Sequence, residues 1–323
     1  MMGLLQNGQW VDKWYDTEVS SGEFRRQDSR FRNWITVDGG AGPSGVKGFK
    51  AEKGRYLLYV SLACPWAHRT LIFRKLKQLE DYIDVVVVDP IMLENGWELS
   101  DPNNKLDFLY QLYLNADENY EGRVTVPVLW DTKLKIIVSN ESSEIIRMFN
   151  SAFNHLNSNV SDYYPESLRS DIDGLNDRVY DTINNGVYRA GFATSQEAYE
   201  KAFLVLFDSL DWIESILSRK RYLAGDQITE ADWRLFTTLI RFDAVYVGHF
   251  KCNHKRIADY PSISAYLREL YQVDGVAETV SLDHIKTHYY KSHLTINPTG
   301  VIPLGPEQDF FASHGRDILF SAN

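Results

Sequence analysis

A single cysteine stands at a position where its thiol can become reactive. Cys64 follows an apolar run at residues 56–61, which predicts a β-strand, and it precedes Pro65 and a helical pattern over 67–79. Proline suits the first position of a helix because the N–H it lacks would be unpaired there anyway. A helix N-terminus carries partial positive charge and free N–H groups, which favour a thiolate and lower the pKa of a cysteine. We therefore predict a nucleophile at Cys64; the alternative is a small buried apolar side chain.

The residues after Cys64 limit the chemistry that its thiol can perform. Ala67 stands where a second cysteine would complete a Cys-x-x-Cys pair, so a local dithiol mechanism is excluded. Arg69 adds a positive charge to the same predicted helix, but its place along the helix leaves open whether it faces the thiol.

Two further segments complete a candidate site for a thiol peptide. Pro127 interrupts the strand pattern at 124–129, and in a thioredoxin-like order of elements a cis-proline here faces the cysteine. The backbone of Val126 is then open to pairing with an extended peptide. Glu141 and Ser142 begin the next predicted helix, where Ser142 and helix N–H groups suit a carboxylate and Glu141 suits an ammonium group. Taken singly, these features also fit a bulge proline and ordinary helix caps.

The pattern along the chain predicts an α/β part followed by an all-α part. A strand, a helix and a buried strand over 56–88 form a β-α-β unit with a right-handed crossover, and strands follow at 124–129 and 136–138. A helix-like stretch covers 106–114. From about residue 165 the spacing of apolar residues is helical. The 323 residues agree with a prior of about two domains plus extensions.

Composition narrows the partners and the compartment. The formal net charge of −10 argues against nucleic acid and against an anionic membrane surface as partners. Two cysteines in different contexts give no disulfide framework, which fits a reducing compartment. The first ten residues hold no apolar h-region, and no run of about 18 apolar residues predicts a membrane span. We expect a cytoplasmic protein, and the histidine spacing predicts no metal site.

Longer motifs resemble one family, the glutathionyl-hydroquinone reductases, which form the xi class of glutathione transferases and are similar to the omega class. The resemblance covers nearly the whole chain. It rests on SLACPWAHRT at 61–70, MLENGW at 92–97, GRVTVPVLWD at 122–131, SNES at 139–142, NNGVY at 184–188, YVGHFKC at 246–252 and TINPTG at 295–300.

The resemblance implies a glutathione transferase fold: an α/β N-terminal thioredoxin-like domain plus an all-α C-terminal domain, in a homodimer. With the patterns above it gives four ranges: an N-terminal extension at 1–50, a thioredoxin-like glutathione-binding domain at 51–155, an all-α substrate domain at 165–292, and an irregular C-terminal extension at 293–323. Scattered aromatic residues in the first extension suggest that it packs on the body of the protein.

Residue roles also follow from the resemblance. Cys64 is the implied nucleophile, and tyrosines implied to line the aromatic-substrate pocket are Tyr188 and Tyr289, with neighbouring Tyr290 left open. The implied glutathione-binding residues are Trp97, Arg123, Val126, Glu141 and Ser142. From residue type alone, Trp97 fits core packing equally well and Arg123 an ordinary surface charge. The Asn-Asn-Gly turn signal at 184–186 likewise allows Tyr188 a structural role.

The implied activity is removal of glutathione from glutathionyl-hydroquinones through a Cys64–glutathione mixed disulfide, with glutathione as co-substrate and no metal. Tyr188 or Tyr289 would donate the proton to the leaving hydroquinone. One alternative is a general omega-like thiol transferase or dehydroascorbate reductase, which shares Cys64. Another is a noncatalytic binding protein on the same scaffold, and the intact Cys64–Pro65 pair argues against it.

Three side chains and one loop remain to be interpreted. Cys252, His68 and His249 are predicted to be structural. The loop at 98–107 is short compared with the family pattern, which predicts an altered pocket rim.

Overall fold

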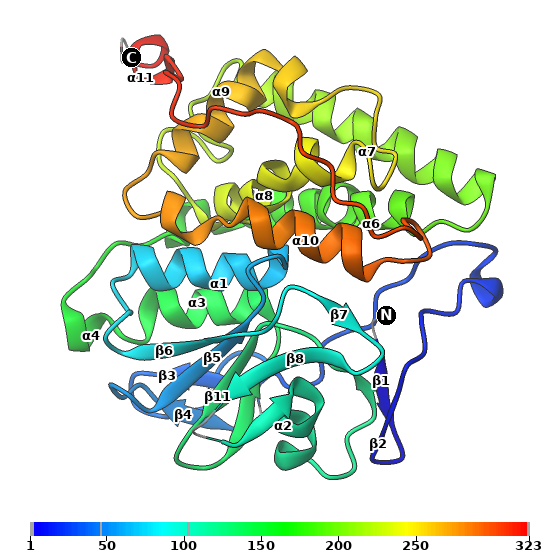
Figure 1. Cartoon of the computed structure of the whole chain (residues 1–323). Helices are drawn as coiled ribbons and strands as arrows, with labels where there is room; N and C mark the ends of the chain where they lie inside the picture. Colours follow the sequence, from blue (N-terminus) through cyan, green and yellow to red (C-terminus); the bar gives the residue numbers. More distant parts are fainter. Residues whose placement is uncertain (1–2, 46, 102–103, 322–323) are drawn as a thin grey trace. The chain divides into compact units, whose positions relative to one another are not determined.

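The structure is a computed structural model that describes residues 3–45, 47–101 and 104–321. This part of the chain divides into two compact units, both discontinuous in sequence (Figure 1). Unit 1 combines the residues through Trp14 with Gln27–Ser161 and Thr279–Ile302, and unit 2 combines Tyr15–Arg26, Asp162–Glu278 and the residues from Pro303. The predicted domain ranges remain predictions. The units cross their limits in both extensions and also in the range 165–292, whose end from Thr279 belongs to unit 1.

Unit 1 is built on a four-stranded sheet in the order β12-β11-β5-β6. Strand β5 pairs in parallel with β6 and antiparallel with β11, which pairs antiparallel with β12. The predicted β-α-β unit is thereby confirmed. The strands of the unit are β1 (Leu4–Gln6), β2 (Gln9–Val11), β3 (Trp34–Thr36), β4 (Gly48–Lys50), β5 (Tyr56–Val60), β6 (Ile83–Val87), β7 (Met92–Leu93), β8 (Gly96–Asp101), β9 (Leu106–Phe108), β10 (Gly122–Arg123), β11 (Val128–Asp131) and β12 (Ile136–Ser139).

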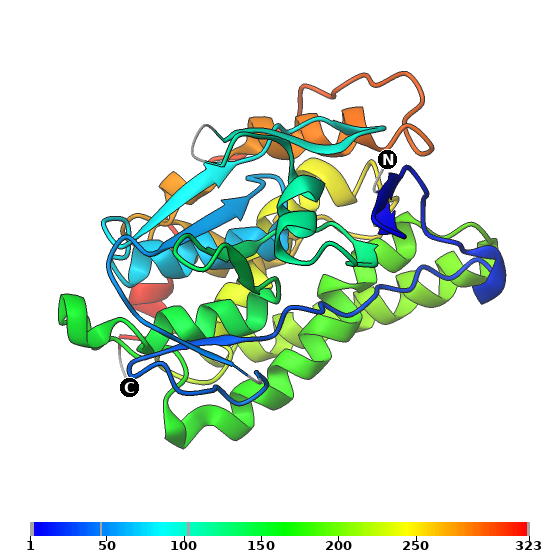
Figure 2. The ribbon, with the colours of Figure 1, turned by 90° about the horizontal axis from the view of Figure 1, so that it is seen from below.

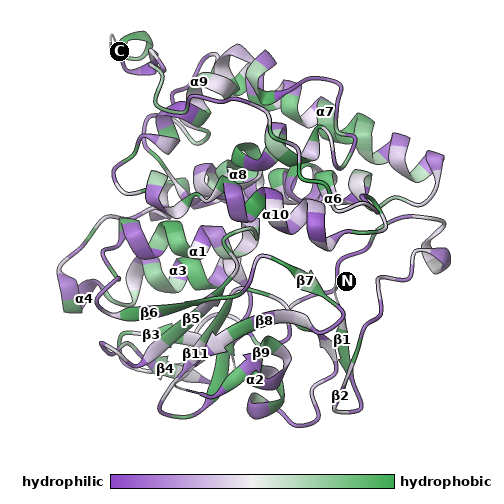
Figure 3. Cartoon of the chain, in the orientation of Figure 1, coloured by the Kyte–Doolittle hydropathy of each residue, from purple (hydrophilic) through white to green (hydrophobic). Residues whose placement is uncertain are grey.

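Helices cover both faces of this sheet. Figure 1 shows α1 and α3 packed together on one face and α2 on the other, and in Figure 3 α1 and α3 alternate between hydrophobic and hydrophilic positions. All five residues of β5 are buried, as a central strand between two helical layers requires. The helices of unit 1 are α1 (Pro65–Leu76), α2 (Leu109–Ala116), α3 (Ser142–Ser151), α4 (Asn154–Asn157) and α10 (Leu282–Ser292).

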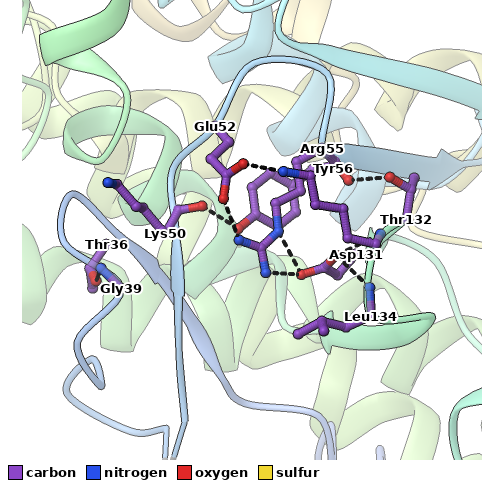
Figure 4. Close-up of polar contacts among 10 residues, drawn as sticks. Thr36, Gly39, Lys50, Glu52, Arg55, Tyr56, Asp131, Thr132 and Leu134 are labelled. Atoms are coloured by element: carbon purple, nitrogen blue, oxygen red, sulfur yellow. Dashed lines mark hydrogen bonds and ion pairs between the residues drawn. The ribbon is translucent and has the colours of Figure 1, made fainter.

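One end of the sheet is closed by a buried ion pair. Arg55, which precedes β5, donates from Nε and Nη2 to Oδ2 of Asp131, the last residue of β11, at 2.9 and 2.6 Å (Figure 4). Asp131 is fully buried, and its other oxygen accepts the backbone N–H groups of Lys133 and Leu134. A third contact joins Arg55 Nη1 to Glu52 at 2.7 Å. The pair fixes the register of β5 against β11.

The N-terminal residues of unit 1 are more ordered than an irregular extension. Strands β1 and β2 form a hairpin, and β10 pairs with β1 rather than with the main sheet. Strands β3 and β4 pair in parallel, and the backbone N–H of Ile35 donates to Met148 Sδ of α3 at 3.1 Å. Figure 2 shows this blue segment running along the green α3. The expectation that the extension packs on the body is confirmed for this unit.

Unit 2 is helical, as predicted. Its main helices are α5 (Arg169–Arg178), α6 (Gly186–Gly191), α7 (Gln196–Leu217), α8 (Glu230–Arg241), α9 (Pro261–Tyr271) and α11 (Arg316–Leu319), with π-helical turns at Val179–Asn184 and Phe242–Tyr246. Helix α8 begins with a capping box between Thr229 and Asp232. Arg316 ties the C-terminal residues to Glu269 of α9 through a buried ion pair at 2.9 Å.

Four sequence expectations are wrong in detail. The strand predicted at 124–129 begins only at Val128 (β11), and the loop at 98–107 contains parts of β8 and β9, with residues 102–103 outside the described residues. Strand β6 is at the edge of the sheet, not inside it, and Val87 is 40% exposed. A run of valines alone does not separate an edge strand from a central one, because edge position depends on the whole sheet. The stretch at 106–114 begins as strand β9 and becomes helix α2 only at Leu109.

Candidate active site

The predicted nucleophile lies at a helix N-terminus, where the sequence placed it. Cys64 is the N-cap residue of α1, with extended backbone angles, and Pro65 takes the first helical position. The Cys64 carbonyl accepts the His68 N–H at 3.0 Å, so the helix begins immediately after the cysteine. The side chain is partly exposed, and the first turn of α1 holds no acidic residue. This environment favours a thiolate and leaves it accessible.

The second segment meets the thiol from the neighbouring strand. The Val126–Pro127 peptide bond is cis, and the Val126 carbonyl oxygen lies 3.6 Å from Cys64 Sγ, which donates to it. Strand β11 begins at Val128, opposite Tyr59 of β5, so pairing of the two strands brings these loops together. The expectation that a cis-proline faces the cysteine is confirmed.

The third segment, the start of α3, places a carboxylate and a hydroxyl near the same end of α1. Glu141 is the N-cap residue, and its Oε1 accepts the N–H and the hydroxyl of Ser143 at 3.0 and 2.8 Å. Its Oε2 makes no hydrogen bond within the part of the chain that the structure describes. Ser142 is buried, and its Oγ accepts Arg69 Nη1 at 3.5 Å.

Arg69 therefore faces the site rather than pointing away. The side chain is 1% exposed, and its guanidinium lies over the Trp66 ring at 4.6 Å from the centroid. Burial raises the pKa of Glu141, but the two hydrogen bonds from Ser143 and the charges of Arg69 and Arg32 outweigh it, so the pKa of Glu141 is lowered. The hydrogen bonds from Ser143, helped by the nearby guanidinium charges, therefore favour the ionised form of Glu141.

Two more predicted glutathione-binding residues belong to unit 1. Trp97, on β8, is 6% exposed and stacks on His288 of α10, with ring centroids 4.9 Å apart. Arg123, on β10, is 9% exposed, and its Nη1 donates to the Lys13 carbonyl. Arg123 is therefore not the exposed surface charge that residue type alone allowed, whereas the burial of Trp97 also fits the core packing allowed for it.

Comparisons with known proteins show the family of this chain. The model for the glutathione S-transferase N-terminal domain matches residues 63–152, and the model for the C-terminal domain matches residues 196–269. The glutathionyl-hydroquinone reductase YqjG of Escherichia coli (strain K12) is 60% identical over 327 residues, covering 99% of this chain and 100% of the relative. This chain belongs to the xi class of glutathione transferases. PcpF of Sphingobium chlorophenolicum, another glutathionyl-hydroquinone reductase, is 53% identical, covering 95% of this chain and 97% of the relative.

Solved structures agree on the transferase fold. The glutathione-bound structure of YqjG has a TM-score of 0.88 at 60% identity, covering 90% of this chain and 97% of that chain. The xi-class transferase from Natrialba magadii has a TM-score of 0.89 at 45% identity, covering 98% and 97%. The predicted fold, a thioredoxin-like N-terminal domain and a helical C-terminal domain, is thus confirmed for this transferase.

Of the two predicted pocket tyrosines, one shares a unit with the cysteine. Tyr289 is 2% exposed on α10, where its ring meets His288 and His293 edge-on at 5.4 and 5.3 Å. Helix α10 is joined to β7 of unit 1, because the Met92 N–H donates to Ser292 Oγ at 3.0 Å. Neighbouring Tyr290 is also largely buried.

The other tyrosine of this xi-class transferase lies in unit 2. Tyr188 sits within α6 rather than in a turn, because only Asn185 separates α6 from the preceding π-helical turn. The Arg26 guanidinium covers its ring at 5.1 Å and also donates to Asn185 Oδ1 at 3.0 Å. Aromatic neighbours of Tyr188 are Phe24, Phe192, Tyr246 and Phe250.

Two site neighbours escaped the sequence analysis. His288 stacks on Trp97, and its Nδ1 forms a hydrogen bond of 2.9 Å to the Pro90 carbonyl oxygen, which is the acceptor. Tyr113, from α2, donates to the Thr125 carbonyl at 2.8 Å and accepts from Asn140 Nδ2 at 3.2 Å. Tyr113 thereby joins the segment before Val126 to the segment before Glu141. Their neighbours come from distant parts of the chain, so local spacing gave no signal.

The remaining cysteine and histidines behave as structural residues. Cys252 is fully buried, and burial raises the pKa of its thiol strongly. His68 Nε2 lies 2.8 Å from Thr279 Oγ1 and ties α1 to the segment before α10. Within the described ranges, no group of three or more His, Cys, Asp and Glu side chains is arranged to hold a metal ion. None of the described helices has the length and apolarity needed to cross a membrane.

Proposed function

We propose that this chain is a glutathione-dependent reductase that removes glutathione from glutathionyl-hydroquinones. The observation that carries the proposal is the placement of Cys64 Sγ at the N-terminus of α1 and 3.6 Å from the Val126 carbonyl, beside the cis-proline. Two relatives named as glutathionyl-hydroquinone reductases share 60% and 53% of its residues over nearly the whole chain.

In the first step, the Cys64 thiolate attacks the sulfur of the glutathionyl thioether. A Cys64–glutathione S–S bond forms, and the bond between sulfur and the aromatic carbon breaks. The electron pair of that bond goes to the ring carbon, which takes a proton and leaves as the free hydroquinone. The sulfur is oxidised and the ring carbon is reduced, so no external reductant enters this step.

In the second step, a glutathione thiolate attacks the glutathione sulfur of the mixed disulfide. Cys64 leaves as a thiolate, and oxidised glutathione departs. The sum is one glutathionyl-hydroquinone and one glutathione converted to one hydroquinone and one oxidised glutathione. Ala67 in place of a resolving cysteine makes this second glutathione necessary.

Glutathione binding is assigned to the residues around the thiol. Val126 offers its backbone to the extended peptide, and the Ser142 hydroxyl and the N–H groups at the N-terminus of α3 donate to a carboxylate. Glu141, ionised and with Oε2 available, meets the ammonium group. Trp97 and Arg123 bind the remaining part of the tripeptide, where a guanidinium suits its second carboxylate.

The proton for the leaving ring carbon is assigned to a tyrosine. A phenol with an ordinary pKa near 10 is protonated at neutral pH and can donate or relay a proton. Tyr289 is supported by its place on α10, which also carries the His288 partner of Trp97. Tyr188 is supported by the family resemblance and by the aromatic cluster around it.

Assembly and compartment complete the proposal. We expect a homodimer that works in the cytoplasm with no metal. Light scattering coupled to gel filtration tests the first point, because a monomer of 37.3 kDa and its dimer differ twofold in mass. Full activity after dialysis against a chelator tests the independence from metal.

The decisive experiment measures release of free hydroquinone from a glutathionyl-hydroquinone in the presence of glutathione, with dehydroascorbate reduction measured in parallel. Strong hydroquinone release with weak dehydroascorbate reduction supports the reductase. The reverse pattern replaces it by the omega-like thiol transferase, with Cys64 still the nucleophile. Glutathione binding without either turnover would leave a binding protein on the transferase scaffold.

A further inference from the structure

The N-terminal hairpin segment, residues 3–13, contacts the glutathione side of the candidate site. Strand β10, which carries Arg123, has β1 as its partner in a three-stranded sheet, with Leu4 opposite Arg123. The Arg123 side chain in turn donates from Nη1 to the Lys13 carbonyl. The backbone and the guanidinium of Arg123 are therefore both held by residues of this segment.

Trp10 of the same segment holds the turn that presents Trp97. Strands β7 and β8 form a hairpin whose two-residue turn is Glu94–Asn95, and Trp97 is the second residue of β8. Trp10 Nε1 donates to the Glu94 carbonyl at 2.8 Å. On its other side the indole stacks on Tyr110 of α2, with ring centroids 5.3 Å apart and planes 18° from parallel.

Gly96 shows how closely the indole approaches this turn. A Cβ atom at Gly96 would lie 2.7 Å from two ring carbons of Trp10, and the Gly96 φ of 73° also disfavours a side chain. The indole therefore packs directly on the backbone next to Trp97. A shift of Trp10 leaves the turn without its hydrogen bond and without its packing surface.

We propose that Trp10 is a positioning residue for glutathione, which fixes the Glu94–Asn95 turn, and through it Trp97, while its segment fixes Arg123. The inference rests on the glutathione-binding role proposed above for Trp97 and Arg123. It places the effect of Trp10 on glutathione binding and not on the chemical step at Cys64. The model of the N-terminal transferase domain matches only from residue 63. The segment at residues 3–13, which precedes that match, thereby becomes part of the site.

The test compares two Trp10 variants with a matched neighbour. Trp10→Phe keeps an aromatic ring on Tyr110 but removes the donor to Glu94, and Trp10→Ala removes both. Gln9→Ala is the control, because Gln9 is an exposed residue of the same hairpin. Glutathione dissociation constants are measured by calorimetry in a Cys64→Ser background, where no mixed disulfide forms. The KM for glutathione and the kcat of hydroquinone release are measured with Cys64 intact.

We expect Trp10→Phe to raise both the dissociation constant and the KM for glutathione by about two- to tenfold, as the loss of one hydrogen bond does. The kcat at saturating glutathione should stay within about twofold of wild type. Trp10→Ala should give a larger rise in both, and Gln9→Ala none. Unchanged glutathione affinity in Trp10→Phe, or a fall in kcat without a change in affinity, overturns the inference.

The two readouts also separate this inference from the proposed function. If wild type binds glutathione but releases no hydroquinone, the proposed reaction fails, while the calorimetric comparison still decides the role of Trp10. If Trp10→Ala does not fold, as circular dichroism would show, Trp10→Phe decides alone. A rise in dissociation constant for Gln9→Ala equal to that for Trp10→Phe would count against Trp10, because it would show a general effect of the hairpin.

Discussion

The paired strands β5 and β11 carry different kinds of polar group at their two ends. At one end, Arg55 and Asp131 close the sheet with a two-point ion pair, and the Asp131 carboxylate accepts four hydrogen bonds from its surroundings. At the other end, Cys64 follows β5, and its sulfur lies 3.6 Å from the Val126 carbonyl oxygen. The same two strands thus carry a fully satisfied polar cluster and a partly exposed thiol.

The difference separates the residues that stabilise the fold from the residue that carries out the chemistry. A buried carboxylate is stable only when paired and hydrogen-bonded, so the Arg55 end is locked in one arrangement. A nucleophile must instead reach a substrate, and the Cys64 side chain is partly exposed. Substitutions at the first end should therefore lower stability and spare turnover, and substitutions at the second end should do the opposite.

The largest expected effect is on turnover, from Cys64→Ser. A serine hydroxyl is not ionised at neutral pH and forms no mixed disulfide, so hydroquinone release should fall on the order of 10⁴-fold or more. The free energy of unfolding should change by less than about 1 kcal/mol, because the side chain is partly exposed and serine is close to cysteine in size. Retained turnover in this variant would remove Cys64 as the nucleophile.

The second effect is on stability, from Asp131→Asn. Loss of this carboxylate leaves Arg55, whose side chain is 11% exposed, without its main partner, and should lower the free energy of unfolding by about 3–5 kcal/mol. Denaturant unfolding measures it. The control is Lys133→Met, which breaks the exposed pair with Glu52 in the same network and should cost about 0–1 kcal/mol. Equal losses in the two variants would contradict the importance of burial here.

The third effect is on glutathione affinity, from Glu141→Gln. Removing the charge that meets the ammonium group should raise the glutathione dissociation constant about ten- to hundredfold, measured by calorimetry. The Gln side chain can still cap α3 through its amide oxygen, so the fold should persist. An unchanged dissociation constant would show that the Glu141 carboxylate serves α3 alone.

Glu141 also predicts a pH dependence of stability. The pKa of this carboxyl in the folded protein is lowered from 4.5, so its ionised form stabilises the fold at pH values above 4.5. That contribution is lost as the pH falls through the lowered folded pKa. The difference in unfolding free energy between wild type and Glu141→Gln should therefore be constant from about pH 7 to 5 and shrink below. A difference that grows on acidification would reverse the sign of the shift.

The smallest effect is expected from Cys252→Ala. Burial raises the pKa of this thiol, so it stays protonated and unreactive at neutral pH, and turnover should stay within about twofold of wild type. Iodoacetamide at pH 7, followed by mass spectrometry, should give one adduct in wild type and none in Cys64→Ser. An adduct on Cys252 in the folded protein would contradict its inert role.

The sequence predicted what depends on local order, and it missed what depends on packing. The cysteine after a strand, Pro65 at the first helical position and the Val126–Pro127 loop all follow from short segments, and the structure confirms them. The direction of Arg69 did not follow, because it depends on the contact of α1 with α3. Tyr113 and His288 join segments far apart in the chain, and no spacing rule encodes such contacts.

Unit 1 is completed late in synthesis. Its last segment, Thr279–Ile302, supplies the Thr279 partner of His68, the His288 ring against Trp97 and the Ser292 acceptor for Met92. Ribosomes add roughly 5–20 residues per second, so roughly 10–50 s pass between the addition of Cys64 and the addition of residue 302. During this interval the nascent chain carries a thiol at a forming helix without the segment that finishes its surroundings. The contacts that hold α1 and Trp97 within unit 1 are therefore complete only after this last segment has been added.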